Sequence, residues 1–440
     1  MQWASRLAIA TAIVVAGACG GSKASNSGAP PSDDAGVDAT AGDSEAPDDD
    51  GGSDVEVYPA PHTPLPLFTN FGGGVLANPK LITVTFTGNA NEAAIRTFDD
   101  QLIAGSWWTS VTQGYGVGAA TGGNYVEVPD TVSNTMLDDS QLPGMISGWI
   151  ASGAAPAPDA NTLYVIYFPS TTTITLQGGV SCNAFGAYHN SGPIGLEGGT
   201  HDTPYAVIPD CGEGMPGLTT SASHEVIEAS TNPHPETTPA WYGYNDAWFK
   251  SGGGTGGQGE VADVCQRAGY VTDSFGNLLV RSWVDAAAMA SQDPCQPEAA
   301  GEIFYSVAVP TQTAASTTTG GTTSGGYIVM KQGTTKTIDS VIFSDGPLPS
   351  DLQLTVGARG YGTLSALGTG ITTTLTPTSG HNGMHVTLTI AVAAGTPAMD
   401  YPTNENSTGI VRATLTGPAA SDGGVTSTHH DWPFIVRVQQ

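Results

Sequence analysis

A segment at residues 221–233, Ser-Ala-Ser-His-Glu-Val-Ile-Glu-Ala-Ser-Thr-Asn-Pro, constrains the fold of this chain more than any other part of its 440 residues. Apolar residues in and just before it recur at the spacing of one helix face, and these are Leu218, Ala222, Val226 and Ala229. The other side carries the polar residues Ser221, His224, Glu225 and Glu228. Because His224 and Glu228 are four residues apart, their side chains lie over one another on a helix. We predict a helix that presents both to one cation.

The pattern resembles that of the HExxH zinc peptidases, in which two histidines bind zinc and the glutamate after the first is the general base. Here the motif reads His-Glu-x-x-Glu, so Glu228 stands where those enzymes have their second histidine. Carboxylates also bind zinc, but the resulting ligand set is harder and less selective for one metal. The resemblance implies His224 and Glu228 as metal ligands and Glu225 as the catalytic base. The alternative is a helix with an ordinary polar face.

A third ligand is needed, and two places in the chain offer one. The first is the segment Gly-Glu-Val-Ala-Asp-Val-Cys at 259–265, from which we select Asp263 as the ligand and Glu260 as its alternative. The second is His234, ten residues after His224, which is the offset of the third ligand in metzincins. His234 lies between two prolines, however, and lacks the glycine that lets such a helix turn.

The N-terminus predicts export. Arg6 is followed by a short apolar run at 7–15 and then by Ala-Gly-Ala-Cys, which ends at Cys19. This run is too short to span a membrane and is typical of a signal peptide over residues 1–19. The cysteine resembles a bacterial lipobox, which implies lipidation at Cys19; the alternative is plain secretion. Residues 20–60 are rich in Gly, Ser, Ala, Pro and Asp and predict a disordered acidic tether.

The charge balance excludes several partners. There are 12 basic and 40 acidic residues, which gives a formal net charge of −28. Binding to nucleic acid needs clustered Lys and Arg and is therefore excluded. Electrostatic docking to anionic lipid is disfavoured for the same reason, so we expect membrane attachment only through the lipid anchor.

Four cysteines remain after Cys19, and an even number in an exported chain favours disulfides. We predict Cys182–Cys211 and Cys265–Cys295, because these pairings close the shorter loops. A cysteine metal site is the alternative, but the chain lacks a Cys-x-x-Cys pair.

Residues 61–300 mix strands and helices and predict an α+β domain. A strand is expected near 81–86, a helix from Asn89 or Asn91 to Leu102, a helical region over 133–151 interrupted at Pro143, a strand buried on both faces at 162–168 and another at 205–208. Aromatic residues near Tyr242 precede a glycine-rich stretch and either line a cleft or cover the helix. Tyr242 is a candidate donor to an oxyanion.

Several of these features occur together in one known family. The series includes Tyr188-His189, the His-Glu-x-x-Glu helix, Thr-Asn-Pro at 231–233, Trp241-Tyr242 and the acidic segment that ends in Cys265. It resembles the exordium or phosphate-induced-protein type of secreted domain over residues 70 to 300. The resemblance implies an extracellular, wall-associated protein and points to His224, Glu225, Glu228 and Asp263. Together with the helix motif, it predicts a zincin-like mixed domain.

Residues 301–440 have a different sequence pattern from the preceding domain. Short runs rich in β-branched and apolar residues alternate with Gly, Ser, Thr and Asp turns, at 327–330, 337–343, 352–356, 386–392, 409–415 and 434–438. This spacing predicts an immunoglobulin-like β-sandwich.

Two functions follow from these observations. The first is an exported, lipid-anchored protein with a metal-dependent, peptidase-like hydrolase domain that uses zinc or another divalent cation. The second is a non-catalytic surface or wall-binding protein in which the same cluster is a structural cation site. The partner expected is a peptide or a cell-wall component.

Overall fold

The computed structural model describes residues 56–196, 199–244, 247–251, 258–266, 268–299, 301–318, 321–358, 367–368, 370–398, 408–416 and 427–439. The expected signal peptide, Cys19 and most of the acidic tether lie outside these ranges. Residues Tyr58–Gln440 belong to one compact unit. Among the described helices, none has the length and apolar character needed to cross a membrane.

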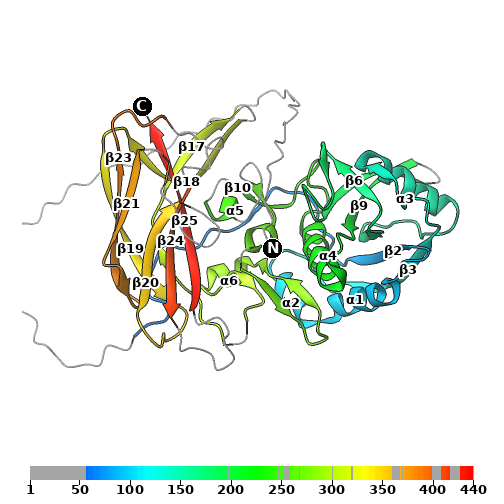
Figure 1. Ribbon diagram of the computed structural model, residues 1–440, viewed down its shortest axis with the longest axis horizontal. Helices are drawn as coiled ribbons and strands as arrows, with labels where there is room; N and C mark the ends of the chain where they lie inside the picture. The colour runs from blue at the N-terminus through cyan, green and yellow to red at the C-terminus, as the bar shows by residue number, and fades with distance from the viewer. Residues whose placement is uncertain are drawn as a thin grey trace, which may run out of the picture. The chain divides into compact units, whose positions relative to one another are not determined.

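A five-stranded sheet forms the centre of the first part of this unit (Figure 1). Its strands, in spatial order, are β3 (Thr121–Val128), β2 (Lys80–Phe86), β5 (Thr162–Phe168), β9 (Gly199–Pro209) and β8 (Tyr188–Leu196). The first four run parallel, whereas β8 is antiparallel to β9 and forms one edge. The central strand β5 is buried at every position, as its continuous apolar run predicts.

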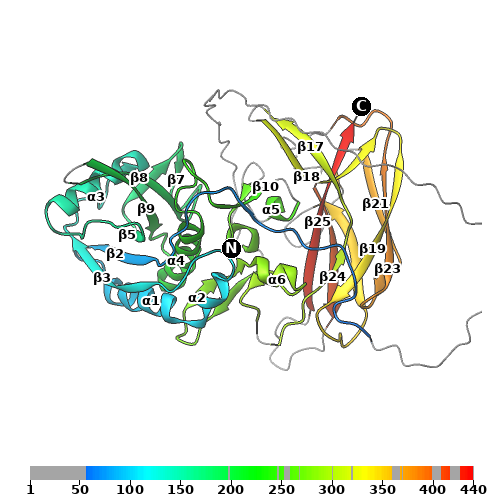
Figure 2. The ribbon, with the colours of Figure 1, turned by 180° about the vertical axis from the view of Figure 1, so that it is seen from behind.

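Helices cover both faces of this sheet (Figures 1 and 2). Successive side chains of a strand point to opposite faces, so β5 contributes to two separate cores. Leu163, Val165 and Tyr167 join a core with α1 (Glu92–Ala104), α2 (Ser106–Val111) and α4 (Gly214–Thr231). Tyr164, Ile166 and Phe168 join a core with α3 (Leu142–Ala151).

The expected helical region at 133–151 is only half correct. Its first part forms a short strand, β4 (Met136–Asp138), and a single 3-10 turn, η1 (Asp139–Gln141). The reason is a capping box, in which Asp138 accepts a hydrogen bond from Ser140 N while the Gln141 side chain accepts one from Asp138 N. Pro143 lies in the first turn of α3, where no N–H is needed, so it begins the helix instead of interrupting it.

The predicted site helix is α4, and its apolar stripe is confirmed. Leu218, Ala222, Val226 and Ala229 are all buried. The polar side differs from an ordinary solvent-facing one, because Glu225 is only 5% exposed and Glu228 only 2% exposed. Strand β8 and the chain around residues 260–263 cover this side.

Shorter elements complete this part of the molecule. They are β1 (Thr69–Asn70), β6 (Thr173–Leu176), β7 (Gly179–Val180), β10 (Trp241–Tyr244), α5 (Ala247–Ser251), β11 (Gln258–Gly259), η2 (Asp263–Cys265), β12 (Tyr270–Thr272), β13 (Leu278–Val280), β14 (Ser282–Trp283), α6 (Asp285–Met289) and β15 (Cys295–Gln296). Strand β10 pairs with both β1 and β11. These pairings hold β10 between β1 and β11.

Residues after 301 form two larger sheets. The four-stranded sheet has the order β16 (Tyr305–Ala308), β19 (Thr335–Ser344), β23 (His385–Val392) and β21 (Ile371–Thr376). The six-stranded sheet has the order β17 (Gln312–Thr318), β18 (Gly321–Lys331), β25 (Ser427–Gln439), β24 (Thr408–Thr416), β20 (Leu352–Ala358) and β22 (Ser379–Gly380). All six predicted strands are present. The α+β class is therefore confirmed, while the immunoglobulin-like and zincin-like assignments and the boundary at 300/301 stay predictions.

Candidate metal centre

Helix α4 brings the predicted ligands together. His224 Nε2 lies 3.1 Å from Glu228 Oε2, as the four-residue spacing predicts. Asp263, the first residue of η2, places its Oδ1 3.5 Å from the same nitrogen. His224, Glu228 and Asp263 therefore meet at one place, although Asp263 comes from a distant part of the chain.

Backbone groups fix the position of Glu228. Its Oε1 accepts hydrogen bonds from the N–H groups of Ala262 and Asp263, at 3.1 and 3.0 Å. Its Oε2 is left to face the imidazoles. The buried carboxylate thus ties α4 to the 260–265 segment and satisfies two backbone donors that are themselves removed from water.

His189 is a member of the site that the sequence alone did not assign. It lies on β8, with Nδ1 3.4 Å from Glu225 Oε2 and 3.8 Å from Glu228 Oε2. Its neighbours Tyr188 and Asn190 point to the opposite face, where both side chains bind Asp139. No spacing rule connects a residue on β8 to α4, because only the sheet brings them together. The available signal was the Tyr-His pair in an extended, half-apolar segment.

Glu260 and Asn232 contact the other nitrogen of the His189 ring. His189 Nε2 lies 3.4 Å from Glu260 Oε1 and 3.2 Å from the carbonyl oxygen of Asn232. The Asn232 side chain donates to Glu260 Oε1 at 2.7 Å, and its own oxygen accepts from Ala240 N at 2.7 Å. Asn232, just after the end of α4, therefore holds Glu260 in place.

The two remaining candidates are His234, which lies outside the cluster, and Tyr242, which lies beside it. His234 Nδ1 is 3.3 Å from Asp202 Oδ2, and it is not among the described residues whose ligand atoms gather around Glu228. Tyr242 lies on β10 beside the cluster. The charge of Glu260, and then burial, raise the pKa of Tyr242 well above its ordinary value, so its hydroxyl remains a hydrogen-bond donor.

Without a bound cation, the cluster retains protons. Burial alone lowers the pKa of His224, but the charges of Glu228 and Glu225 reverse this and raise it well above its usual value. Burial raises the pKa of Glu228 to about 8, although the charge of His224 opposes the rise. For His189, burial is likewise outweighed by the charge of Glu260, and its pKa is raised. A cation that binds here must therefore displace protons.

The donor set fits a divalent cation. Ligand atoms fall into two groups, His189 with Glu228 and Glu260, and His224 with Glu225 and Glu228. Within each group all the atoms lie within 4.8 Å of one another. With Asp263, the site gathers four carboxylates and two imidazoles, of which His189, Glu225 and Glu228 are buried and the other three are partly exposed. Uncompensated carboxylates are costly to bury, and a divalent cation would supply compensating charge.

Two disulfides support the segments that carry the site. Cys182–Cys211 and Cys265–Cys295 form the predicted pairs, with S–S distances of 2.03 and 2.07 Å. Cys182 precedes β8 and Cys211 precedes α4. Cys265 ends η2, two residues after Asp263. Each bridge therefore lies close in sequence to a candidate ligand.

Comparisons with known proteins give no family. No family model matches the chain, and no curated protein matches it. One solved structure that is found is that of domains 4 and 5 of the S-layer protein SbsC, at 10% identity and a TM-score of 0.15. The match covers 30% of this chain and 53% of that one, so the chain spans about half of that structure. This likeness is too weak to support an argument, and the resemblance to exordium-type domains stays a prediction.

Proposed function

We propose that this protein is an exported, lipid-anchored, metal-dependent hydrolase of zincin-like type that cleaves peptide bonds. The observation that carries the proposal is that His224, Glu228 and Asp263 meet around one turn of α4, with Glu228 buried and Glu225 beside them. Two disulfides fit an extracellular setting, because such bonds persist in oxidising compartments.

His224 Nε2, Glu228 Oε2 and Asp263 Oδ1 are the proposed ligands of the cation. Zinc accepts this mixture of nitrogen and oxygen donors. When bound, the cation polarises a substrate carbonyl and lowers the pKa of a coordinated water. The backbone donors on Glu228 hold the ligand rigid, because they fix one of its oxygens while the other remains available.

Glu225 is the proposed general base. It follows His224 directly, so its side chain points about 100° away from that of His224 around the helix and lies beside the ligands. Its Oε2 is 3.4 Å from His189 Nδ1, which orients the carboxylate. In this position it takes a proton from the attacking water and returns it to the leaving amine. Tyr242, kept protonated next to Glu260, is placed to donate to the oxygen that becomes negative.

The test combines metal analysis with hydrolysis of casein and of a mixed fluorogenic peptide library. We expect the full chain, purified without chelator, to retain a divalent cation and to cleave peptides. Glu225→Gln should keep the cation and lose turnover by at least about a hundredfold, the usual contribution of a general base. Glu127→Gln, the same substitution on the exposed face of β3, is the matched control and should change neither.

His224→Ala separates the proposal from a purely structural polar helix. Loss of this ligand should abolish both the bound cation and the cleavage. The proposal is wrong if the purified protein retains no divalent cation after exposure to zinc or manganese. It is also wrong if Glu225→Gln and wild type act equally on every substrate tested.

A further inference from the structure

The candidate ligands form two groups that meet at a single residue. One group lies on α4 alone and contains His224, Glu225 and Glu228. The other joins three elements, with His189 from β8, Glu228 from α4 and Glu260 from the segment before η2. We propose that the centre binds two divalent cations, the first between His224, Glu228 and Asp263 and the second in the group of His189, Glu228 and Glu260, with the Glu228 carboxylate as the bridge. This inference rests on the metal site of the proposed function and adds a second cation to it.

Glu228 has the geometry of a bridging ligand. Its Oε1 already accepts two backbone hydrogen bonds, so its position does not depend on the imidazoles. Its Oε2 faces both histidines, at 3.1 Å from His224 Nε2 and 3.8 Å from His189 Nδ1. In two-metal hydrolytic sites the cations lie about 3.5–4 Å apart, which suits ligand groups that share one carboxylate.

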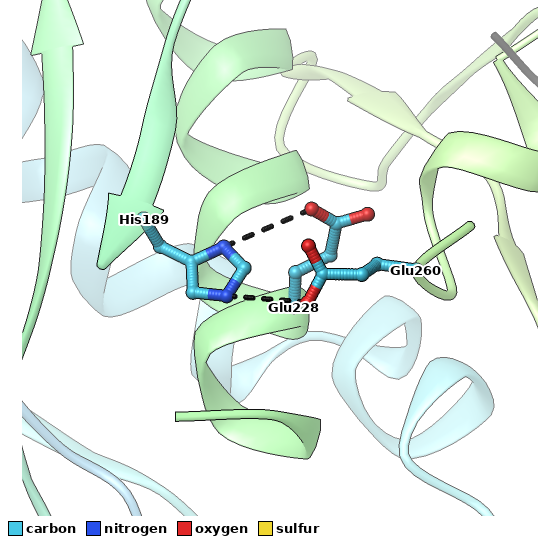
Figure 3. Close-up of side chains that lie close together, drawn as sticks. All are labelled: His189, Glu228 and Glu260. Carbon is cyan, nitrogen blue, oxygen red and sulfur yellow. Dashed lines mark ion pairs between the residues drawn. The ribbon is translucent and has the colours of Figure 1, made fainter. Parts of the chain in front are cut away.

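The second group is formed by buried side chains that point toward one another. Figure 3 shows the two nitrogens of the His189 ring facing different carboxylates, one that of Glu228 and the other that of Glu260. The side chain of His189 is 3% exposed and that of Glu260 is 14% exposed. Asn232 holds Glu260 Oε1 at 2.7 Å, and its carbonyl oxygen lies on the same side of the ring. This carbonyl adds an oxygen donor to the imidazole and the two carboxylates.

Charge balance favours two cations over one. The carboxylates of Glu225, Glu228, Glu260 and Asp263 carry four negative charges when ionised, and neutral imidazoles carry none. One divalent cation leaves two of these negative charges to be balanced by protons or by water, whereas two cations balance all four. Uncompensated buried charge is strongly unfavourable. The competing arrangement has one cation, with a protonated His189 paired to Glu260.

The donors also indicate which cation enters the second group. One imidazole with two carboxylates and a backbone carbonyl is an oxygen-rich set, and such sets suit Mn²⁺ better than softer metals. The first position, between His224, Glu228 and Asp263, also has an imidazole and carboxylates, and it offers the tighter pair of His224 and Glu228. We therefore expect zinc to fill the first position and manganese to fill the second readily.

Stoichiometry tests the inference. The full chain is stripped with chelator, titrated with Zn²⁺ or Mn²⁺ and measured by calorimetry and by metal analysis after desalting. Wild type should bind two cations. Glu260→Gln should weaken the second cation by at least about tenfold, as loss of groups around a metal commonly does, and should leave the first unchanged. Glu127→Gln, on β3, is the matched control and should still bind two.

A measurement on the wild-type protein removes any dependence on how the variants fold. With Mn²⁺ in both positions, electron paramagnetic resonance should show the signal of two exchange-coupled ions instead of that of isolated Mn²⁺. Binding of one cation, with an uncoupled signal and no effect of Glu260→Gln, overturns the second site but leaves the proposed function intact. Binding of no cation overturns both.

Discussion

The stability of the protein should depend on the protonation of Asp99, because this carboxyl is buried between α1 and the central sheet. It is 1% exposed, and it accepts hydrogen bonds from Thr83 Oγ1 and Tyr167 OH, each at 2.5 Å. Burial raises its pKa from 3.8 to about 7, although both hydrogen bonds act in the opposite direction. The folded protein therefore holds a proton on Asp99 over a range in which the unfolded chain releases it.

The sign and size of the effect follow from this shift. A rise of about three pKa units corresponds to roughly 4 kcal/mol, since each unit is worth about 1.4 kcal/mol. Because the pKa is higher in the folded state, the free energy of unfolding falls as the pH rises from about 4 to about 7. Below that pH range the carboxyl is protonated in both states, so its titration does not change the free energy of unfolding. Above it, folding must bury a carboxylate.

Asp99→Asn removes the titration and keeps the shape of the side chain. Its oxygen can still accept from one hydroxyl, and its amide can donate to the other. Urea unfolding of wild type and variant at about pH 4 and about pH 8 measures the change. The free energy of unfolding of the variant, relative to that of wild type, should increase by roughly 4 kcal/mol from about pH 4 to about pH 8.

A matched control isolates the buried position from a general loss of charge. Asp351→Asn removes a carboxylate whose side chain is 59% exposed. The free energy of unfolding of this variant, relative to that of wild type, should hardly depend on pH. The reasoning about Asp99 is refuted if Asp99→Asn and wild type lose stability in parallel as the pH rises.

Three further predictions concern the candidate centre. Glu228→Ala should abolish cation binding and lower the free energy of unfolding by about 2 kcal/mol or more, because Ala262 N and Asp263 N lose their acceptor; unchanged calorimetry or urea unfolding would contradict this. Replacing Cys265 and Cys295 together by serine should cost about 2–4 kcal/mol and weaken cation binding, because Asp263 loses its nearby support; full retention of affinity in a folded variant would oppose it. His234→Asn should leave cation binding unchanged, because His234 pairs with Asp202; a lost cation in calorimetry would place His234 in the site.

The sequence predicted the parts of the fold that depend on local patterns. The apolar stripe of α4 and the continuous apolar run of β5 each have one clear periodicity, and both were assigned correctly. The two disulfides followed from the shorter loops. The pattern around Pro143 predicts one interrupted helix and does not reveal the strand at 136–138, because the Asp138 capping box starts a new element there.

The sequence predicted the part of the candidate centre that lies on α4 and the acidic segment that approaches it. His224 and Glu228 share a helix face, and an acidic segment downstream offered Asp263, which the fold does bring to them. His189 and Asn232 could not be assigned, because their role depends on β8 being the antiparallel neighbour of β9 and on how the chain leaves α4. Glu260, which the sequence offers as an alternative to Asp263, contacts His189 Nε2 and belongs to a second group of donors.

The position of the bound cation tests the central claim most directly. Crystals of the full chain grown with zinc, measured on either side of the zinc absorption edge, should show an anomalous peak at about 2.0–2.2 Å from both His224 Nε2 and Glu228 Oε2. The His224→Ala variant, treated in the same way, should lack this peak. Crystals of the wild type that show anomalous density elsewhere, but none between His224 and Glu228, would contradict the proposed metal centre.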